Sequence, residues 1–174
     1  MKTLVSKMSS LKLLKIEMFA GALVMAIAII LLPVGVITVD IELLANPYIL
    51  GVLLIGALFF ASVGYFIFIR PYIVYRKLPT VQVETDGEYL YIHTKKEAKI
   101  PLSSLDGAIA YSELPFIYQK EFLREIIIHL FSDEYGIVVL EIPDYGTFKM
   151  RFVSYADRVA QELANFIAEA TSNQ

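Results

Sequence analysis

The side chains that could do chemistry are few and lie far apart along the chain. The only histidines are His93 and His129, and each alternates with apolar neighbours on a run that predicts a β-strand. A metal site needs such residues brought together with carboxylates at a spacing such as HExxH, which the sequence lacks. We therefore interpret both histidines as packing or surface residues and predict no metal ligand.

Serines and carboxylates form no catalytic set either. Ser103, Ser104 and Asp106 lie in a predicted turn without a nucleophile-elbow motif, so capping of that turn explains them. Asp133 and Glu134 are adjacent turn residues whose side chains diverge, which disfavours an acid–base pair. The chain has no cysteine and no phosphate-cradling glycine loop. We expect no catalytic residue, no cofactor and no enzymatic activity.

A basic cluster is the first candidate for binding. Lys95, Lys96 and Lys99 lie close together in the sequence, and anionic lipid attracts such lysines by roughly 1 kcal/mol each. The alternative is a solvated strand edge, where lysines discourage edge pairing. The cluster predicts either lipid-headgroup contacts or edge protection, and the net charge of −3 makes nucleic acid an unexpected partner.

An apolar segment in a predicted loop is the second candidate for binding. It consists of Leu114, Pro115, Phe116, Ile117 and Tyr118. If exposed, such a patch is costly in water and favours a partner that covers it. Three outcomes stay open: the segment folds back into the core, dips into the bilayer interface, or docks onto another membrane protein.

Two long uncharged runs indicate that the chain, and with it the two candidate binding segments, is anchored in a membrane. The chain is 57% hydrophobic with a mean hydropathy of +0.61, and most of that excess lies between Met18 and Ile69. Residues 18–39 are uncharged, and at 1.5 Å per residue they span about 33 Å, enough for a bilayer core of about 30 Å. Residues 47–69 form the second run, with Asn46-Pro47 as a helix start and Arg70-Pro71 as its stop. Residues 18–77 thus predict a two-span transmembrane hairpin.

Charges flanking the runs predict the orientation of the hairpin. The link between the spans is short and acidic, whereas basic residues precede the first span and follow the second. By the positive-inside rule, a multi-pass protein of the cell membrane with both termini cytoplasmic is expected. The alternative of a cleaved signal peptide is disfavoured, because no small-residue cleavage site precedes the acidic link.

Small residues on the spans predict helix packing. They are Ala22 and Ala26 on the first span, and Ala57, Ala61 and Gly64 on the second. Small side chains let helix backbones approach closely. Packing within the hairpin and contact with a second copy of the chain both remain open.

Residues 1–17 form a basic segment with an apolar stripe that includes Leu4, Met8 and Leu11. This pattern is typical of a basic amphipathic helix lying in the membrane interface. A plain extension of the first span is the alternative.

Residues 78–174 have the mixed composition of a folded domain, placed on the cytoplasmic side by the charge rule. Alternating apolar residues and turn signals predict seven short strands. One amphipathic helix follows them, from Ala156 to Ala170. The expected fold is an α+β membrane protein: a two-helix hairpin plus a seven-stranded antiparallel sheet or barrel with a C-terminal helix. The predicted strands lie at residues 81–83, 90–92, 99–102, 107–111, 124–131, 136–142 and 147–153.

The segments VETDGEYLYIHT and AKIPLSSLDGAIAY, within residues 83–111, resemble bacterial pleckstrin-homology-like (PH-like) domains found behind two-helix membrane anchors, including the YcxB-like group. The resemblance implies a PH-like fold and a binding role, and it carries no catalytic residues. One departure is the acidic first turn, Asp86-Gly87-Glu88, where phosphoinositide-binding PH domains place basic residues. Specific phosphoinositide binding is therefore not expected.

These features predict a membrane-anchored interaction module at the inner leaflet. Its expected partners are the lipid bilayer and either another protein or a second copy of the chain. An anionic-lipid or envelope-stress sensor is the alternative from the basic residues. An accessory or immunity subunit of a transporter or peptide-toxin system is a further alternative, which rests on analogy.

Overall fold

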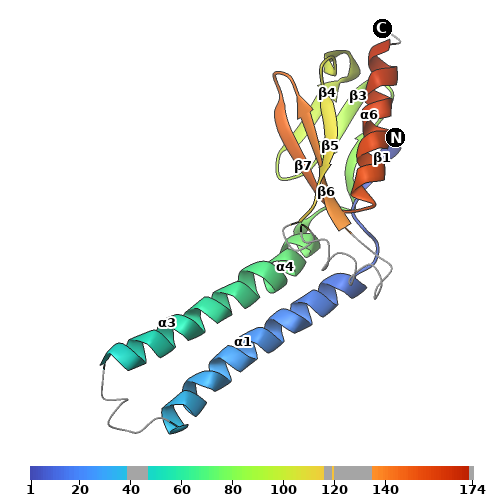
Figure 1. The fold of residues 1–174 in the computed structure, drawn as a ribbon. Helices are drawn as coiled ribbons and strands as arrows, with labels where there is room; N and C mark the ends of the chain where they lie inside the picture. The colour runs from blue at the N-terminus through green and yellow to red at the C-terminus, as the bar shows by residue number, and fades with distance from the viewer. Residues whose placement is uncertain (39–46, 116–118, 120–134, 173–174) are drawn as a thin grey trace. The chain divides into compact units, whose positions relative to one another are not determined.

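The computed structural model describes residues 1–38, 47–115, 119 and 135–172 (Figure 1). The chain divides into two compact units. One comprises Leu11–Arg76, and the other combines Met1–Ser10 with Lys77–Gln174. The β-rich unit is therefore built from both ends of the sequence, with the helical unit inserted between them.

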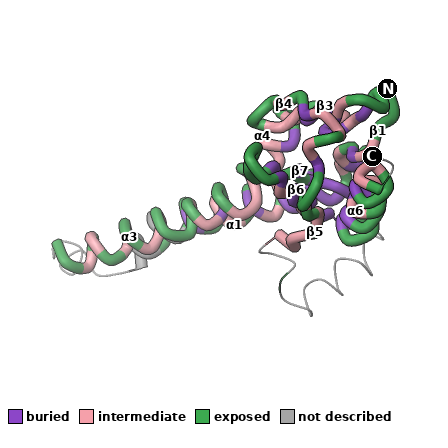
Figure 2. The backbone as a smooth tube through the Cα atoms, turned by 90° about the horizontal axis from the view of Figure 1, so that it is seen from above, coloured by how far each residue is buried: buried purple, intermediate pink, exposed green. Residues whose placement is uncertain are grey.

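The helical unit holds two segments that are long and apolar enough to cross a membrane, Lys12–Ile30 and Pro47–Lys77. The uncharged runs of the sequence predict both. Helix α1 spans Lys12–Thr38 and packs against the second segment, which begins with α3, Pro47–Val63. Figure 2 shows exposed and intermediate residues along the length of α3, and no described residue of that helix is buried.

The second helical segment does not stop at Arg70-Pro71, so that predicted helix end is wrong. Helix α3 continues through a π-helical segment, η1 (Gly64–Ile69), into α4 (Arg70–Lys77). Proline has no N–H, and its ring crowds the carbonyl four residues earlier in an α-helix. In the widened turn the Arg70 N–H donates to the Tyr65 carbonyl, five residues back. The hydrogen-bond ladder therefore shifts just before Pro71, and the chain stays helical through it.

Two glycines lie at a close contact between α1 and η1. A Cβ on Gly64 would lie 2.7 Å from Met25 Cγ and 3.0 Å from the Gly21 carbonyl oxygen. A Cβ on Gly21 would overlap Phe68 Cβ and lie 2.9 Å from the Gly64 carbonyl oxygen. Real side chains do not tolerate such distances, so the helices reach this separation because both positions lack a side chain.

The first sheet of the β-rich unit has four antiparallel strands in the order β1-β2-β3-β4. Tyr89 to His93 pair with Glu97 to Pro101 across β3 and β4 in an unbroken register. The strands are β1 Lys2–Ser6, β2 Val81–Thr85, β3 Tyr89–His93 and β4 Glu97–Pro101.

The second sheet has three antiparallel strands in the order β5-β6-β7, and helix α6 follows it. A 3₁₀ turn, η2 (Leu102–Ser104), separates the sheets, and Leu105 and Ala108 continue the turn through backbone hydrogen bonds. The elements are β5 Ile109–Glu113, β6 Tyr135–Ile142, β7 Gly146–Ser154 and α6 Ala156–Ser172.

Two separate sheets replace the predicted single seven-stranded sheet or barrel. Within the described residues β4 pairs with β3 alone and β5 with β6 alone, because the turn after Pro101 leads the chain out of the first sheet. The α+β class with antiparallel strands is confirmed. The predicted strand at residues 124–131 lies outside the described residues.

Residues 2–6 form a strand, so an amphipathic helix over the N-terminal segment is wrong for these residues. Strand β1 pairs antiparallel with β2, which buries Val5 to 1% exposure beside Val83. Edge pairing satisfies backbone groups and buries the apolar face of a segment too short for a stable helix. Helix α1 begins at Lys12, so residues 12–17 extend the first span.

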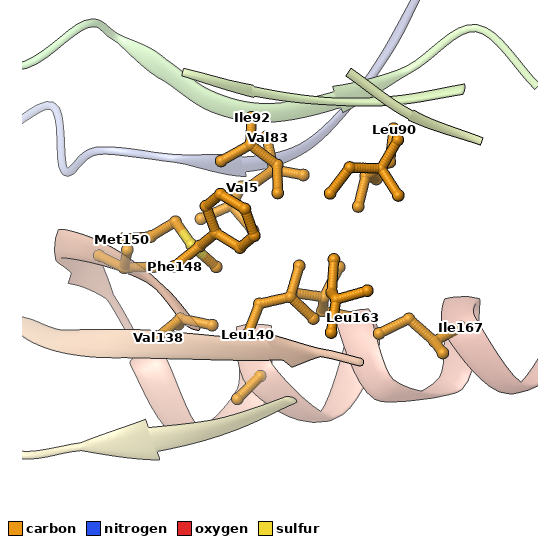
Figure 3. Close-up of a cluster of buried hydrophobic side chains, with 14 of the residues drawn as sticks. Val5, Val83, Leu90, Ile92, Val138, Leu140, Phe148, Met150, Leu163 and Ile167 are labelled. Carbon is orange, nitrogen blue, oxygen red and sulfur yellow. The ribbon is translucent and has the colours of Figure 1, made fainter. Parts of the chain in front are cut away.

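The core of the β-rich unit lies between the two sheets and one face of α6 (Figure 3). The alternation within β2, β3, β6 and β7 sends every second side chain into it, and Leu163 and Ile167 of α6 complete it. Its labelled members in Figure 3 come from both sheets and the helix: Val5, Val83, Leu90, Ile92, Val138, Leu140, Phe148, Met150, Leu163 and Ile167.

The buried side-chain amide of Gln82 joins the two sheets. The register of β1 on β2 pairs Ser6 with Val81 and then Val5 with Val83, so Gln82 has no partner on β1. Gln82 is fully buried, its Nε2 donates to the Arg151 carbonyl at 2.7 Å, and its Oε1 accepts from the Arg151 N–H at 2.9 Å. The side chain therefore bonds β7 as a neighbouring backbone would.

Candidate interaction surface

Strand β5 exposes two large apolar side chains on its outer face. Ala108 and Ala110 pack against the core, so the strand alternation turns Ile109 and Tyr111 outward. Ile109 is 59% exposed and Tyr111 is 38% exposed. Small residues point inward and large ones outward, which is the reverse of an ordinary core strand.

Polar side chains hold this outer face in a fixed arrangement. The Tyr111 hydroxyl donates to Glu141 Oε1 at 2.9 Å, and this bond raises the pKa of Tyr111 above its usual value of 10.0. Lys149 Nζ donates to Glu113 at 2.9 Å, from β7 to β5. Val139 lies opposite both Tyr111 and Lys149 and is fully buried. The result is an apolar strip edged by satisfied polar groups, as interaction surfaces commonly show.

A shallow hollow of about 310 Å³ lies beside Ile109. Its wall includes Gly107, Pro143 and Gly146, which leave room because two of them have no side chain. The hollow is at the small end of ligand-pocket sizes. A single protruding side chain of a partner fits such a volume better than an enclosed small molecule. The remaining lining residues are Ile109, Glu141, Ile142 and Thr147.

The predicted apolar segment begins where β5 ends. Leu114 and Pro115 are partly buried, whereas Phe116, Ile117 and Tyr118 lie outside the described residues. The exposed face of β5 thus leads in sequence directly into that segment.

The three lysines of the basic cluster have different surroundings. Lys95 and Lys96 are exposed at the connection between β3 and β4. The Lys99 ammonium lies over the rings of Tyr89 and Tyr91, 3.9 and 5.4 Å from their centroids. Lys95 and Lys96 are therefore exposed to solvent, and Lys99 is engaged with aromatic rings.

The acidic turn between β2 and β3 is held by its own hydrogen bonds. Asp86 Oδ1 accepts the N–H groups of Glu88 and Tyr89 at 2.9 and 2.8 Å, and Oδ2 accepts the Tyr91 hydroxyl at 2.7 Å. The Tyr91 hydroxyl and these two N–H groups lower the pKa of Asp86 from 3.8 to about 2. The same Tyr91 bond raises the pKa of Tyr91. The turn is therefore a hydrogen-bonded hairpin end that carries the Asp86 carboxylate.

The candidate chemical groups are dispersed. His93 Nε2 lies 3.1 Å from Glu84 Oε1, an isolated pair across β2 and β3. Ser103 and Ser104 belong to the η2 turn. Within the described part of the chain, no cluster of three or more His, Asp or Glu side chains could hold a metal ion. His129, Asp133 and Glu134 lie outside that part.

The small residues predicted for helix packing separate into two sets. Gly64 is buried at the contact with α1, and Ala57 and Ala61 are partly buried on α3. Ala22 and Ala26 are exposed on α1. Packing within the hairpin thus uses Gly64 with Gly21, a glycine that the spacing of alanines did not single out.

Sequence reasoning placed a strand at residues 107–111 but missed its outward side chains. The available signal was the alternation itself, with alanines at 108 and 110 between the larger Ile109 and Tyr111. Periodicity alone does not tell which face of a strand is buried.

Comparison of this chain with protein families, with curated proteins and with solved structures finds no match. The fold and the β5 surface therefore carry the functional proposal.

Proposed function

We propose that this protein is a membrane-anchored interaction module whose PH-like domain binds a protein partner at the inner leaflet of the cell membrane. The observation that carries the proposal is the insertion of an apolar hairpin into a domain with an exposed apolar strand. A tethered surface reaches its partner at high effective concentration, so a weak contact becomes useful.

The order of elements supports a PH-like domain. Among the residues that the structure describes, a four-stranded and a three-stranded antiparallel sheet enclose one core, and a C-terminal helix closes it. Seven strands followed by one helix are the elements of the PH architecture. Here the first strand, β1, is separated from the second by the hairpin.

The pairing of β1 with β2 supports a common side for both ends of the hairpin. β1 leads into α1, and α4 leads into β2 (Figure 1). Because the two strands are neighbours in one sheet, a hairpin that spans the bilayer would have both of its ends on the same face. The basic residues that flank the spans favour the cytoplasmic face.

The β5 surface is the proposed partner site. Ile109 and Tyr111 offer apolar and aromatic contact area on a strand whose backbone is already ordered, so binding requires little additional loss of entropy. The hollow beside Ile109 would receive one side chain of the partner. Glu113, Lys149 and Glu141 would form the polar rim.

Affinity purification of the full chain from native membranes in mild detergent tests this proposal. Ile109→Asp and Tyr111→Ala should each reduce recovery of the co-purifying protein by about tenfold or more, the effect of losing about 1.4 kcal/mol or more at a central contact. Tyr155→Asn is the matched control, because Tyr155 is an exposed aromatic residue with φ +51, a conformation that asparagine tolerates.

Two results would contradict a protein partner on β5. One is the chain recovered alone as a monomer from gently solubilised native membranes. The other is a partner that stays bound to both β5 variants. A second copy of the chain as the only co-purifying protein would make self-association the function of this surface.

A lipid-sensing role is the second candidate, favoured by the exposure of Lys95 and Lys96. Anionic lipid should retain the protein through these side chains, and salt should weaken that attraction by screening. To measure the contact, a label is attached at residue 95 of the full chain. Its accessibility is then compared in vesicles with and without anionic lipid. Equal accessibility in neutral and anionic vesicles at low salt would exclude it.

A further inference from the structure

The two chain segments that join the hairpin to the sheet are short. Residues 7–11 lie between β1 and α1, and residues 78–80 lie between α4 and β2. Motion of either span therefore reaches the sheet after a few residues of backbone.

Lys7 ties these two connections together. Its backbone N–H donates to the Thr80 carbonyl at 2.9 Å, and its Nζ donates to the Leu78 carbonyl at 2.7 Å. Both acceptors lie on the connection that returns from the hairpin. These two bonds are named the Lys7 clasp.

Met8, the next residue, links the connection between β1 and α1 to the second sheet. The Met8 N–H donates to the Phe152 carbonyl at 2.7 Å. Phe152 has φ +58, a left-handed conformation that a bulky side chain rarely adopts. It lies in β7 at the register shift opposite Gly136 and Ile137. A strained residue is therefore held in part by a hydrogen bond from the entrance of the hairpin.

A force on either connection acts first on the ends of β1 and β2 that adjoin the hairpin. The strands are antiparallel neighbours, and the two connections leave from adjacent ends at Ser6 and Val81. If the two connections moved apart, the hydrogen bonds between β1 and β2 would break one after another, starting at the Lys7 clasp. The register is already irregular at this end, between Val5 and Ser6.

We propose that the Lys7 clasp is a mechanical switch: displacement of one membrane span relative to the other opens the clasp, frays β1 from β2 and releases Phe152 from its left-handed conformation. The hairpin thereby reports the state of the bilayer to both sheets of the domain. This inference does not require the partner site on β5, so either one can fail alone.

A change in the thickness of the bilayer would displace one membrane span relative to the other. The uncharged part of helix α1, residues 18–38, is about 32 Å long, and such a helix tilts when the hydrocarbon core is thinner than its apolar length. The full chain is placed in nanodiscs of short-chain dimyristoleoyl or long-chain dierucoyl phosphatidylcholine, and hydrogen exchange is followed by mass spectrometry. We expect peptides containing residues 5–8 and 79–82 to exchange several-fold faster in the short-chain bilayer, with β3 and β4 unchanged.

Lys7→Met removes the side-chain bond of the clasp and keeps the apolar stem. It should raise exchange at residues 5–8 and 79–82 by about tenfold, which corresponds to about one hydrogen bond. Lys2→Met makes the same change at the far end of β1 and should leave these peptides unchanged. Equal exchange in the two bilayers, for the native chain and for Lys7→Met alike, overturns the proposal.

A cross-link gives a test that does not depend on the folding of the Lys7 variant. The native chain has no cysteine, so Ser6→Cys with Val81→Cys introduces one defined pair across the ladder. Oxidation should abolish the dependence of exchange on bilayer thickness, and reduction should restore it. A dependence that persists in the oxidised protein shows that the strain acts elsewhere and overturns the switch.

Discussion

Replacing Gln82 by methionine should destabilise the β-rich unit strongly, although the volume of the side chain hardly changes. Gln82 is fully buried and makes two bonds to the backbone of Arg151, at 2.7 and 2.9 Å. Without them, an N–H and a carbonyl between the sheets lose their partners. Each orphaned group costs about 1–3 kcal/mol when buried. Because these groups are only partly buried, the expected loss is about 2–4 kcal/mol of unfolding free energy.

Thermal unfolding of the full chain in detergent, followed by near-ultraviolet circular dichroism of its 11 tyrosines, measures this loss. A change of that size lowers the melting temperature of a domain of about 100 residues by about 10 °C or more. Gln161→Met, on the exposed face of α6, is the control and should change the melting temperature little. A Gln82→Met protein that melts within about 2 °C of the native chain would refute the view that this amide joins the sheets.

Two further perturbations address the hairpin and the acidic turn. Gly64→Ala should weaken packing against α1 by about 1–3 kcal/mol, since the new Cβ would lie 2.7 Å from Met25 Cγ. Gly56→Ala should be neutral because nothing lies within 4 Å of its Cβ, and the mobility of the hairpin in detergent gels compares the two variants. The pKa of Asp86 falls from 3.8 to about 2 on folding, so its contribution to stability is present above pH 4 and is lost as the pH drops towards 2. Asp86→Asn should therefore flatten the acid dependence of the melting temperature between those pH values, and an unchanged profile would contradict the Tyr91 hydrogen bond.

Local patterns were enough to predict the parts of the fold that local physics determines. Uncharged runs require a non-aqueous surrounding whatever their partners, so both helical segments follow from composition. The Asp86-Gly87 turn and the alternation around it likewise predict β2 and β3. The C-terminal helix follows from the spacing of its apolar residues between Ala156 and Ala170.

Non-local pairing explains what the sequence did not reveal. The apolar stripe of residues 4–11 suits a helix as well as a strand, and only β2, on the far side of the hairpin, decides between them. The bond of Gln82 to Arg151 depends on the register shift of β1, which no local pattern encodes. The exposure of Ile109 depends on which face of β5 meets the core. Each of these features is set by a partner that is distant along the chain.

Because the hairpin is inserted after β1, we expect the β-rich domain to lose stability when residues 1–77 are removed. A fragment of residues 78–174 contains every strand that the structure describes except β1, so Val83 loses its neighbour Val5 and the edge of β2 is left open. It should unfold at a lower temperature or form aggregates, because an open, apolar strand edge pairs with other chains.

Replacing residues 9–77 by a short glycine–serine loop should restore a soluble, cooperatively folded domain. The reason is that Lys7 and Thr80 are already hydrogen-bonded at 2.9 Å, so the loop has almost no distance to cover. Thermal unfolding and gel filtration compare the two proteins. Equal stability of the fragment without β1 would show that β1 is dispensable. In that case β1 would only hold the first span to the sheet and would not stabilise the domain. A displacement of the hairpin would then have no effect on the sheet beyond β2.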